Sequence, residues 1–322
     1  MKKTNKCVAL VLAVITIFSA FSIVPITASA KETSVVSTSA KTPTSGECGK
    51  NAKWKIDSKG VLTIYGKGEV SFDSDLRNCV HKNAKEVKVS NGITKLYGGI
   101  FDQGVKIKKA TIADSVKTLG KSTFNLCESL KTVKIGNGVT KLPSCTFSWC
   151  KNLKSVELGS KVKSVETDIF ENCDVIDKIT INKSNKNLCT VNNVIYTKNK
   201  SKIVLYPQGK KDTKYSILKG TKTIGKCAFA FAKNLKNITI PSSVTKIQNS
   251  AFISCTKLKK LTIPKTVKVI EPLAYGFQFN MDVNEMVDFQ IIKSDGFTIY
   301  GNVGSSAYRY SKNFKVNFVK VK

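Results

Sequence analysis

The chain reads SVKTLGKSTFNLCESLKTVKIGN over residues 115–137 and then, at once, GVTKLPSCTFSWCKNLKSVELGS over residues 138–160. The apolar positions of the second stretch repeat those of the first at an offset of 23 residues, and the next segment repeats them again. The matched columns are Val116, Val139 and Val162; Leu119, Leu142 and Val165; Phe124, Phe147 and Phe170; Cys127, Cys150 and Cys173; and Leu130, Leu153 and Ile176. One such unit cannot bury its own apolar side chains, so the repeat predicts a stack of coils that share a continuous core.

Each unit predicts one short strand and one tight turn. Residues 130–135 alternate as a strand does, with Val133 and Ile135 facing inward and Thr132 and Lys134 facing outward. Stacking would place these strands in a parallel sheet on one face, about 4.8 Å apart. The segment before the strand is too short for a standard helix and predicts a helical or 3₁₀ turn on the other face. A period in the twenties is typical of leucine-rich repeats, so the expected fold is a β-rich leucine-rich repeat solenoid of about eight coils, capped at both ends.

The first 30 residues have the composition of a cleavable secretory signal. Three lysines precede an uncharged apolar run, which ends in the small residues Ala-Ser-Ala. The alternative is an uncleaved membrane anchor, because the uncharged run could nearly span a bilayer. Residues 31–46 are rich in Ser and Thr, lack apolar periodicity and predict a linker. We therefore expect a secreted or extracellular protein, either free or associated with the cell surface, with no transmembrane segment after signal cleavage.

The repeat divides the rest of the chain. Residues 47–69 alternate around a turn and predict an N-terminal β-hairpin cap, because an uncapped end coil would expose apolar residues to water. The solenoid is expected over residues 70–289, and its first unit, residues 70–92, is degenerate. A hairpin insertion near residues 185–218, which we expect to be extruded from the side of the stack, breaks the period. Residues 290–322, with two strand-like runs around a short Ala/Tyr segment, predict a C-terminal cap.

Lysine dominates the charge of the chain. There are 53 basic and 22 acidic residues, and removal of a signal with three lysines would leave 50 basic residues. Arg77 and Arg309 are the only arginines. Because lysine is a hydrated point charge that suits bidentate phosphate or base recognition poorly, the excess favours diffuse attraction to anionic surfaces over specific nucleic-acid binding. The alternative is a solvated coat with no partner.

The cysteines fall into the repeat. Nine would remain after signal cleavage, and Cys127, Cys150, Cys173 and Cys255 share one column, which predicts buried thiols packed between coils. Ala232 occupies the same column in another unit. Neighbouring coils are close enough for disulfides, so bridges are the alternative to free thiols.

The repeat consensus, Val-x-x-(Leu/Ile)-x-x-x-x-Phe-x-x-Cys-x-x-Leu-x-x-(Val/Ile)-x-Ile-(Pro), resembles the BspA-type leucine-rich repeat of bacterial cell-surface proteins. Its plainest instance is NSAFISCTKLKKLTIPKTVKVI from Asn249. The opening CGKNAKWKIDSKGVLTIYGKG and the ending GNVGSSAYRYSKNFKVNFV are similar to the modules that flank such arrays. The resemblance covers about residues 47–322. It implies adhesion, or binding to a host or matrix protein, as the class of function.

Motifs for catalysis, metal binding or a cofactor were not found. His81 is the only histidine and stands in a core column of the degenerate unit, where a packing or surface role is expected. The cysteines lack the short paired spacing that zinc selects. Glu86, Glu157 and Asp177 do not form a paired column of the kind that glycoside hydrolysis needs. We expect a non-enzymatic protein without metal or cofactor, and a glycan-active enzyme is the remote alternative.

One exposed feature repeats, and it is basic. A lysine follows the leucine column in most units, and Asp177 interrupts the series. Stacking is expected to turn these lysines into a ladder along the rim of the sheet, where anions could bind or where the charges could simply protect the sheet from edge pairing. The candidate ligand-binding ladder is Lys85, Lys108, Lys131, Lys154, Lys236 and Lys259. The candidate exposed strand positions are Thr132, Lys134, Lys109 and Lys260.

These features together predict a surface-associated monomer that binds a protein or an anionic glycan, such as a cell-wall polymer, through its basic sheet face. The alternative is a structural envelope protein held electrostatically to anionic wall polymer without a specific partner.

Overall fold

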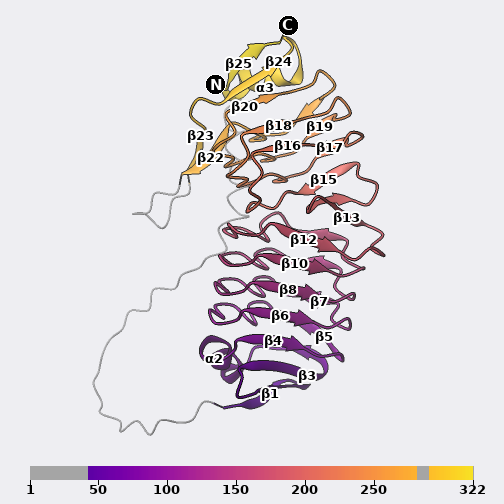
Figure 1. Ribbon diagram of the computed structural model, residues 1–322, viewed down its shortest axis with the longest axis vertical. Helices are drawn as coiled ribbons and strands as arrows, with labels where there is room; N and C mark the ends of the chain where they lie inside the picture. Colours follow the sequence, from indigo (N-terminus) through magenta and orange to yellow (C-terminus); the bar gives the residue numbers. More distant parts are fainter. Residues whose placement is uncertain (1–42, 281–289, 322) are drawn as a thin grey trace, which may run out of the picture. The chain divides into compact units, whose positions relative to one another are not determined.

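A computed structural model describes residues 43–280 and 290–321 of the chain. The expected signal, residues 1–30, and most of the expected linker lie outside the described residues. The chain divides into two compact units, and the second of these, residues 42–279 and 292–322, holds the repeats. It is a β-solenoid of about 11 turns, whose coils follow one another in sequence order (Figure 1). The count exceeds the expected eight: β3 (Val61–Val70) lies before the first expected unit, β16 (Lys214–Ser216) lies in the expected insertion, and β24 (Thr298–Gly301) and β25 (Asn317–Lys320) lie in the expected C-terminal cap.

The main sheet runs along one face of the first half of the stack. It has ten strands in the order β1 (Ser45–Gly49), β2 (Asn51–Ile56), β3, β4, β6, β8, β10 and β12, with β5 (Ile93–Leu96) and β7 (Thr118–Leu119) attached through β3. Its parallel repeat strands are β4 (Glu86–Val89), β6 (Lys109–Ile112), β8 (Thr132–Ile135), β10 (Ser155–Leu158) and β12 (Lys178–Ile181). Each strand pairs with the next at an offset of 23 residues, as in Ala110 with Val133 and Val133 with Val156. The predicted register is therefore confirmed.

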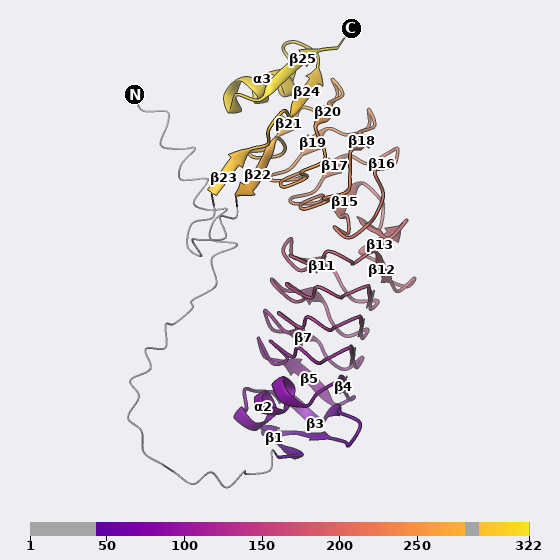
Figure 2. The same ribbon diagram turned by 60° about the vertical axis from the view of Figure 1, so that its left-hand side comes forward.

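A second set of very short strands lies on another side of each coil (Figure 2). In the first half they are β5 (Ile93–Leu96), β7 (Thr118–Leu119), β9 (Lys141–Leu142) and β11 (Ser164–Val165). In the second half they are β17 (Thr223–Ile224), β19 (Lys246–Ile247) and β21 (Val269–Ile270). These strands are also parallel, with Leu96 paired to Leu119 and Ile224 to Ile247.

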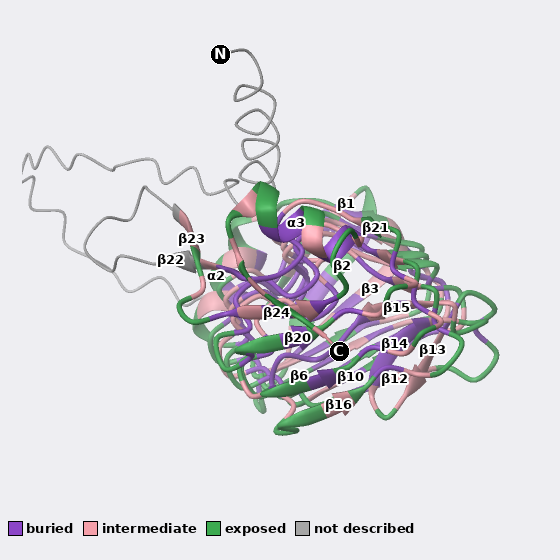
Figure 3. Cartoon of the chain, turned by 90° about the horizontal axis from the view of Figure 1, so that it is seen from above, coloured by how far each residue is buried: buried purple, intermediate pink, exposed green. Residues whose placement is uncertain are grey.

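The core is a set of files of like residues, enclosed by the strands and turns (Figure 3). The rings of Phe101, Phe124, Phe147 and Phe170 stack with centroids 5.1, 5.8 and 5.5 Å apart. These spacings suit offset stacking, which adds to the stability gained from burial alone. Matched residues thus lie in adjacent layers, as the repeat predicts.

The side of each coil between the two strands is built from turns. Asn125 N donates to Ser122 O and Cys127 N to Phe124 O, which are bonds of the 3₁₀ type, i to i−3. Between them, Phe124 N and Leu126 N donate to carbonyls of the next coil. Ser122 and Leu126 have φ of 57°, so left-handed residues interrupt any continuous helix. One coil is thereby joined to the next on this side too.

The N-terminal end differs from a simple hairpin. β1 (Ser45–Gly49), β2 (Asn51–Ile56) and β3 form an antiparallel set, and β3 pairs in parallel with β4. The degenerate first unit contains a helix that the repeat pattern does not predict, α2 (Ser74–Lys82). Asp73 caps this helix by accepting a hydrogen bond from Leu76 N at 2.7 Å.

The insertion is a three-strand meander that is built into the stack. β13 (Leu188–Val191), β14 (Val194–Thr197) and β15 (Lys202–Leu205) are antiparallel, and β15 then pairs in parallel with β17. The expected hairpin is present as β14 and β15, but it is not extruded from the side of the stack, because Val194, Ile195 and Tyr196 are fully buried. The meander coincides with a break, since β12 ends the main sheet and β16 (Lys214–Ser216) pairs only with β18 (Asn237–Thr239) among the described strands.

The C-terminal end continues the stack. β20 (Lys260–Thr262), β24 and β25 form a parallel sheet, and α3 (Ser306–Phe314) connects β24 to β25. The Ala/Tyr segment is thus a two-turn helix, capped by Ser305, whose hydroxyl accepts from Tyr308 N. β22 (Phe277–Asn280) and β23 (Gln290–Lys293) form a separate two-stranded sheet.

Candidate interaction face

Four of the six ladder lysines stand on consecutive coils of the first half. Backbone hydrogen bonds join them directly: Lys108 N to Lys85 O at 2.7 Å, Lys131 N to Lys108 O at 2.8 Å, and Lys154 N to Lys131 O at 2.9 Å. All four side chains are exposed. We call Lys85, Lys108, Lys131 and Lys154 the four-lysine strip.

The strip has defined ends. Lys85 N donates to Gly60 O at 2.8 Å, and Asp177 N donates to Lys154 O at 3.4 Å. A residue without a side chain therefore stands on the coil before the strip, and an exposed carboxylate stands on the coil after it. The interruption at Asp177 limits the strip to four coils.

The other two ladder lysines lie beyond the break. Lys236 N donates to Thr213 O at 2.8 Å, and Lys259 Nζ donates to Asp295 O at 3.2 Å. Both are exposed, but they belong to the coils of β16, β18 and β20, which pair with no strand of the main sheet. The structure thus brings Lys85, Lys108, Lys131 and Lys154 together and separates Lys236 and Lys259 from them.

The four candidate strand positions are all exposed. Thr132 and Lys134 are on β8, Lys109 on β6 and Lys260 on β20. Thr132 lies between Lys109 and Ser155 in the parallel register, which places hydroxyl groups beside the strip. Lys109 differs from the others because its Nζ is 3.4 Å from a carboxylate oxygen of Glu86.

The lysines of the short strands are paired with acids. Lys95 contacts Glu69 at 2.9 Å, Lys141 contacts Glu166 at 2.5 Å, and Lys246 contacts Glu271 at 2.7 Å. In contrast, no side chain of the four-lysine strip takes part in an ion pair with any residue that the structure describes. Lys95, Lys141 and Lys246 are therefore compensated by neighbouring acids, whereas the lysines of the four-lysine strip are not.

In the column of residues next to the short strands, lysines do not stand on consecutive coils. Backbone bonds join Lys117 N to Thr94 O and Lys163 N to Thr140 O, both at 2.8 Å, so that lysine alternates with threonine along the stack. Lysines two coils apart are about 10 Å apart along the backbone, beyond the screening length of about 8 Å at physiological ionic strength. Lysines on consecutive coils, about 4.8 Å apart, repel each other by roughly 1 kcal/mol per pair in water, and movement of the side chains lowers this value. If the lysines served only to keep the protein soluble, the alternating arrangement would be sufficient.

The cysteine column is a structural feature. The thiols of Cys127, Cys150, Cys173 and Cys255 are buried and free, and each donates to a backbone carbonyl 26 residues earlier at 2.9 to 3.1 Å. Burial raises the pKa of Cys255 to about 12 and the pKa of Cys79, which lies in α2, to about 11. Because the thiolate is the reactive form, Cys255 and Cys79 are poor nucleophiles.

Two carboxylates, Asp168 and Glu171, lie on the turn side of the last coil before the break, and the sequence did not predict that they interact. Asp168 is 4% exposed, and Cys145 Sγ lies 3.6 Å from its Oδ2. Burial and then the charge of Asp168 raise the pKa of Glu171 to about 7. The sequence did contain a signal for this pair, because Asp168 stands in a repeat column that small residues occupy in other units. Its burial denies access to a substrate, and nowhere in the described part of the chain do three or more His, Cys, Asp or Glu side chains gather closely enough to hold a metal.

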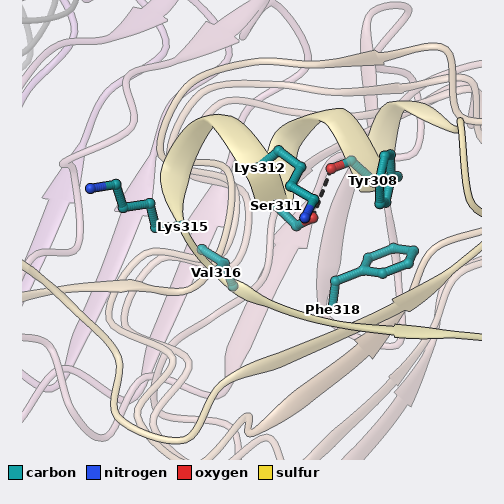
Figure 4. Close-up of a pocket in the computed structure, with 6 residues that line it drawn as sticks. All are labelled: Tyr308, Ser311, Lys312, Lys315, Val316 and Phe318. Carbon is teal, nitrogen blue, oxygen red and sulfur yellow. Dashed lines mark hydrogen bonds between the residues drawn. The ribbon is translucent and has the colours of Figure 1, made fainter.

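Two further features lie outside the four-lysine strip. His81 Nε2 donates to Asp102 O at 3.1 Å, which ties α2 to the next coil. A shallow hollow of about 330 Å³ lies between α3 and β25 (Figure 4). Tyr308 and Phe318 meet there edge to face at 5.3 Å, and Lys312 lies over the Tyr308 ring.

The chain belongs to the family of BspA type leucine rich repeat regions. The family model matches six copies, over residues 77–200 and 208–313. Leucine-rich repeat proteins of this kind bind other proteins and are usually non-enzymatic. No curated protein matches the chain.

Several bacterial proteins are among the solved structures that resemble the chain. A leucine-rich repeat protein from Eubacterium ventriosum is 26% identical, with a TM-score of 0.55, over 71% of this chain and 68% of that one. The pneumococcal vaccine antigen PcpA is 16% identical, with a TM-score of 0.44, over 85% of this chain and 98% of that one. A leucine rich cell surface protein from Faecalibacterium prausnitzii is 17% identical, with a TM-score of 0.41, over 88% and 96%. Within residues 43–280 and 290–321, no helix has the length and apolar character that crossing a bilayer requires.

Proposed function

We propose that this protein is an exported, non-enzymatic binding module that attaches to a macromolecule through the outer face of its main sheet. The observation that carries the proposal is the four-lysine strip, in which like charges stand on consecutive coils without an acidic partner among the described residues. Arrangements that cost free energy in the free protein are relieved when an anionic ligand is bound. Membership of a family whose fold serves binding supports the same conclusion.

The proposal includes a location outside the cell, at or near the surface of the producing bacterium. The basic, apolar and small-residue segments of residues 1–30 support export. The protein is proposed to act as a monomer, with a protein or an anionic glycan as its partner.

A glycan and matrix-protein array at low and physiological salt tests this function. The wild-type chain is compared with a variant carrying Lys131→Glu and Lys154→Glu, which reverses half of the strip. The matched control carries Lys117→Glu and Lys163→Glu, because these exposed lysines lie on the same part of the stack and the net charge changes equally. Saturable binding that survives physiological salt, is lost in the strip variant and persists in the control would support the proposal.

The second candidate is a structural envelope protein held to anionic wall polymer, which the lysine excess over the whole chain favours. In that case the strip and control variants would weaken binding to purified wall equally. Moderate salt would abolish it, because attraction between exposed charges is screened. Hydrolysis of any polysaccharide on the array would contradict both functions.

A further inference from the structure

We infer that the C-terminal end of the stack is a docking site for an extended, acidic segment of a protein partner. The segment adds to the outer edge of β25 as a further strand and places one apolar side chain in the hollow between β25 and α3. This site is separate from the four-lysine strip and does not depend on the function proposed for the main sheet. Three features support it: an unpaired strand edge, an apolar hollow beside that edge, and basic side chains around both.

The outer edge of β25 has backbone groups without a strand partner. Among the described strands, β25 pairs with β24 alone, in parallel. Val321 N donates to Gly301 O at 2.9 Å. Because backbone groups point to alternate sides along a strand, the N–H and C=O groups of Phe318 and Lys320 point away from β24. An added strand offers the matching donors and acceptors, which is how exposed sheet edges bind extended peptides.

The hollow beside this edge suits an apolar side chain. It has a volume of about 330 Å³, with Tyr308 on α3 and Val316 and Phe318 across from it (Figure 4). Small-molecule pockets begin at about 300 Å³, so a hollow of this size suits one side chain better than a bulky ligand. On the opposite face of β25, Val319 is 43% exposed, and an added strand would cover apolar surface there too.

The charge around the edge favours an acidic partner. Residues 296–321 contain no Asp or Glu, but they include Arg309, Lys312, Lys315 and Lys320. None of these side chains forms an ion pair with a residue that the structure describes, and Lys312 and Lys315 line the hollow. A carboxylate beside the apolar anchor would therefore meet an uncompensated ammonium group. A second copy of this chain fits less well, because its own β25 would bring further lysines against the same charges.

Fluorescence anisotropy of the full chain with a labelled peptide, Thr-Glu-Thr-Leu-Thr-Glu-Thr, tests the inference. In an extended strand the leucine and the glutamates share one face, so that the leucine can enter the hollow while the glutamates lie beside its lysines. We expect saturable binding of this peptide. A peptide with lysine in place of glutamate should bind roughly tenfold more weakly. A version that is N-methylated at every interior residue lacks the backbone donors and should not bind.

Variants of the chain locate the site. Lys312→Glu with Lys320→Glu reverses the charge beside the hollow, and Lys117→Glu with Lys163→Glu changes the net charge equally at exposed positions elsewhere. The first pair should weaken binding of the acidic peptide roughly tenfold, and the second by less than about twofold. Lys320→Pro removes an N–H that points away from β24, whereas Lys320→Gln removes the charge alone. The proline variant should bind roughly fivefold more weakly than the glutamine variant.

Several results would overturn the inference. Equal binding of the N-methylated peptide excludes strand addition, and equal binding of the lysine peptide excludes charge recognition. If the acidic peptide shows no saturable binding, or if both charge-reversal pairs weaken it equally, the edge lysines serve only to protect β25 from pairing. Self-association of the wild type that Lys320→Pro abolishes would identify a second copy as the occupant. Loss of peptide binding in Lys131→Glu with Lys154→Glu would place the peptide on the four-lysine strip instead.

Discussion

Two residues of a typical coil have left-handed backbones, and most of them are not glycine. Gly99 has φ of 67° and its counterpart one coil later, Ser122, has φ of 57°. A Cβ at Gly99 would have Asp102 Cβ, at 3.7 Å, as its near contact, so an added methyl group meets no steric clash. Gly99→Ala should therefore lower the free energy of unfolding by about 1 kcal/mol, through backbone strain alone. Ser122→Gly should change it in the opposite direction by a smaller amount, since the glycine also frees the unfolded chain. Urea denaturation measures both, and equal stability of Gly99→Ala and wild type would contradict the argument.

Glu171 predicts a pH dependence of stability. Its pKa is raised to about 7, from 4.5, by burial and by Asp168. A raised carboxyl pKa means that the folded state binds a proton more tightly than the unfolded state, so this contribution is complete below about pH 4.5 and is lost as the pH rises to about 7. The loss is on the order of 3 kcal/mol at most, at about 1.4 kcal/mol per unit. The free energy of unfolding, measured by denaturation, should fall more between pH 5.5 and pH 8 in the wild type than in Glu171→Gln. An unchanged difference in the variant would contradict the assignment.

The sequence predicted which residues share a column, because residues that are buried at equivalent positions of each coil recur at a fixed period in the sequence. It did not predict the left-handed positions. Leu126 and Trp149 both have φ near 60°, yet neither residue type indicates such a conformation. The contacts between coils fix that backbone conformation, and they become visible only once the stack is built. Likewise, the column of thiols was predicted to be buried, but their hydrogen bonds to carbonyls of the previous coil were not.

At the scale of elements, α2 is the clearest departure from the repeat. Asp73→Ala removes the acceptor of the Leu76 N–H, and loss of such an N-cap costs about 1 kcal/mol. Asp75→Ala, in the first turn of the same helix, loses only an exposed charge near the helix dipole and should cost about 0.3 kcal/mol. Thermal unfolding of the two variants compares them directly. Equal losses would indicate that charge and not capping is responsible.

The signal for α2 was present in the sequence. Asp73 is a good N-cap, and the buried Leu76, Cys79 and Val80 have helical spacing. The 23-residue register also continues through this unit, and it masks the local helical pattern. The short strands could not have been predicted in the same way. Two residues, as in β7 or β9, are too few to show any period, and their pairing depends on the coils above and below.

At the scale of the molecule, coils should be removable as whole units. Deletion of residues 138–160 takes out one period and leaves Phe124 and Phe170 as neighbours in the ring file. We expect a folded protein of somewhat lower stability, because each coil contacts its neighbours only. Deletion of residues 138–149 should prevent folding, since it brings unlike columns together. Circular dichroism and thermal unfolding distinguish the two, and similar folding of both would contradict the layered core.

The first deletion also removes Lys154, so that three lysines remain in the strip. The stack architecture and the exposure of the strip could be derived from the period. The separation of Lys236 and Lys259 from the strip could not, because it depends on how the meander is accommodated and the sequence shows only that the period fails there.

The break beside the meander divides the backbone hydrogen bonding of the sheet face. Side chains bridge it: the Gln208 amide donates to Phe170 O, and Lys233 contacts Asp174 at 2.9 Å. Side-chain bridges couple neighbouring coils more weakly than a continuous backbone ladder does. Amide hydrogen exchange should therefore show two blocks of protected amides with separate opening energies, one in the coils of β4 to β12 and one in those of β16 to β21. Under mechanical load or partial denaturation, the seam at the meander is where this molecule would come apart first.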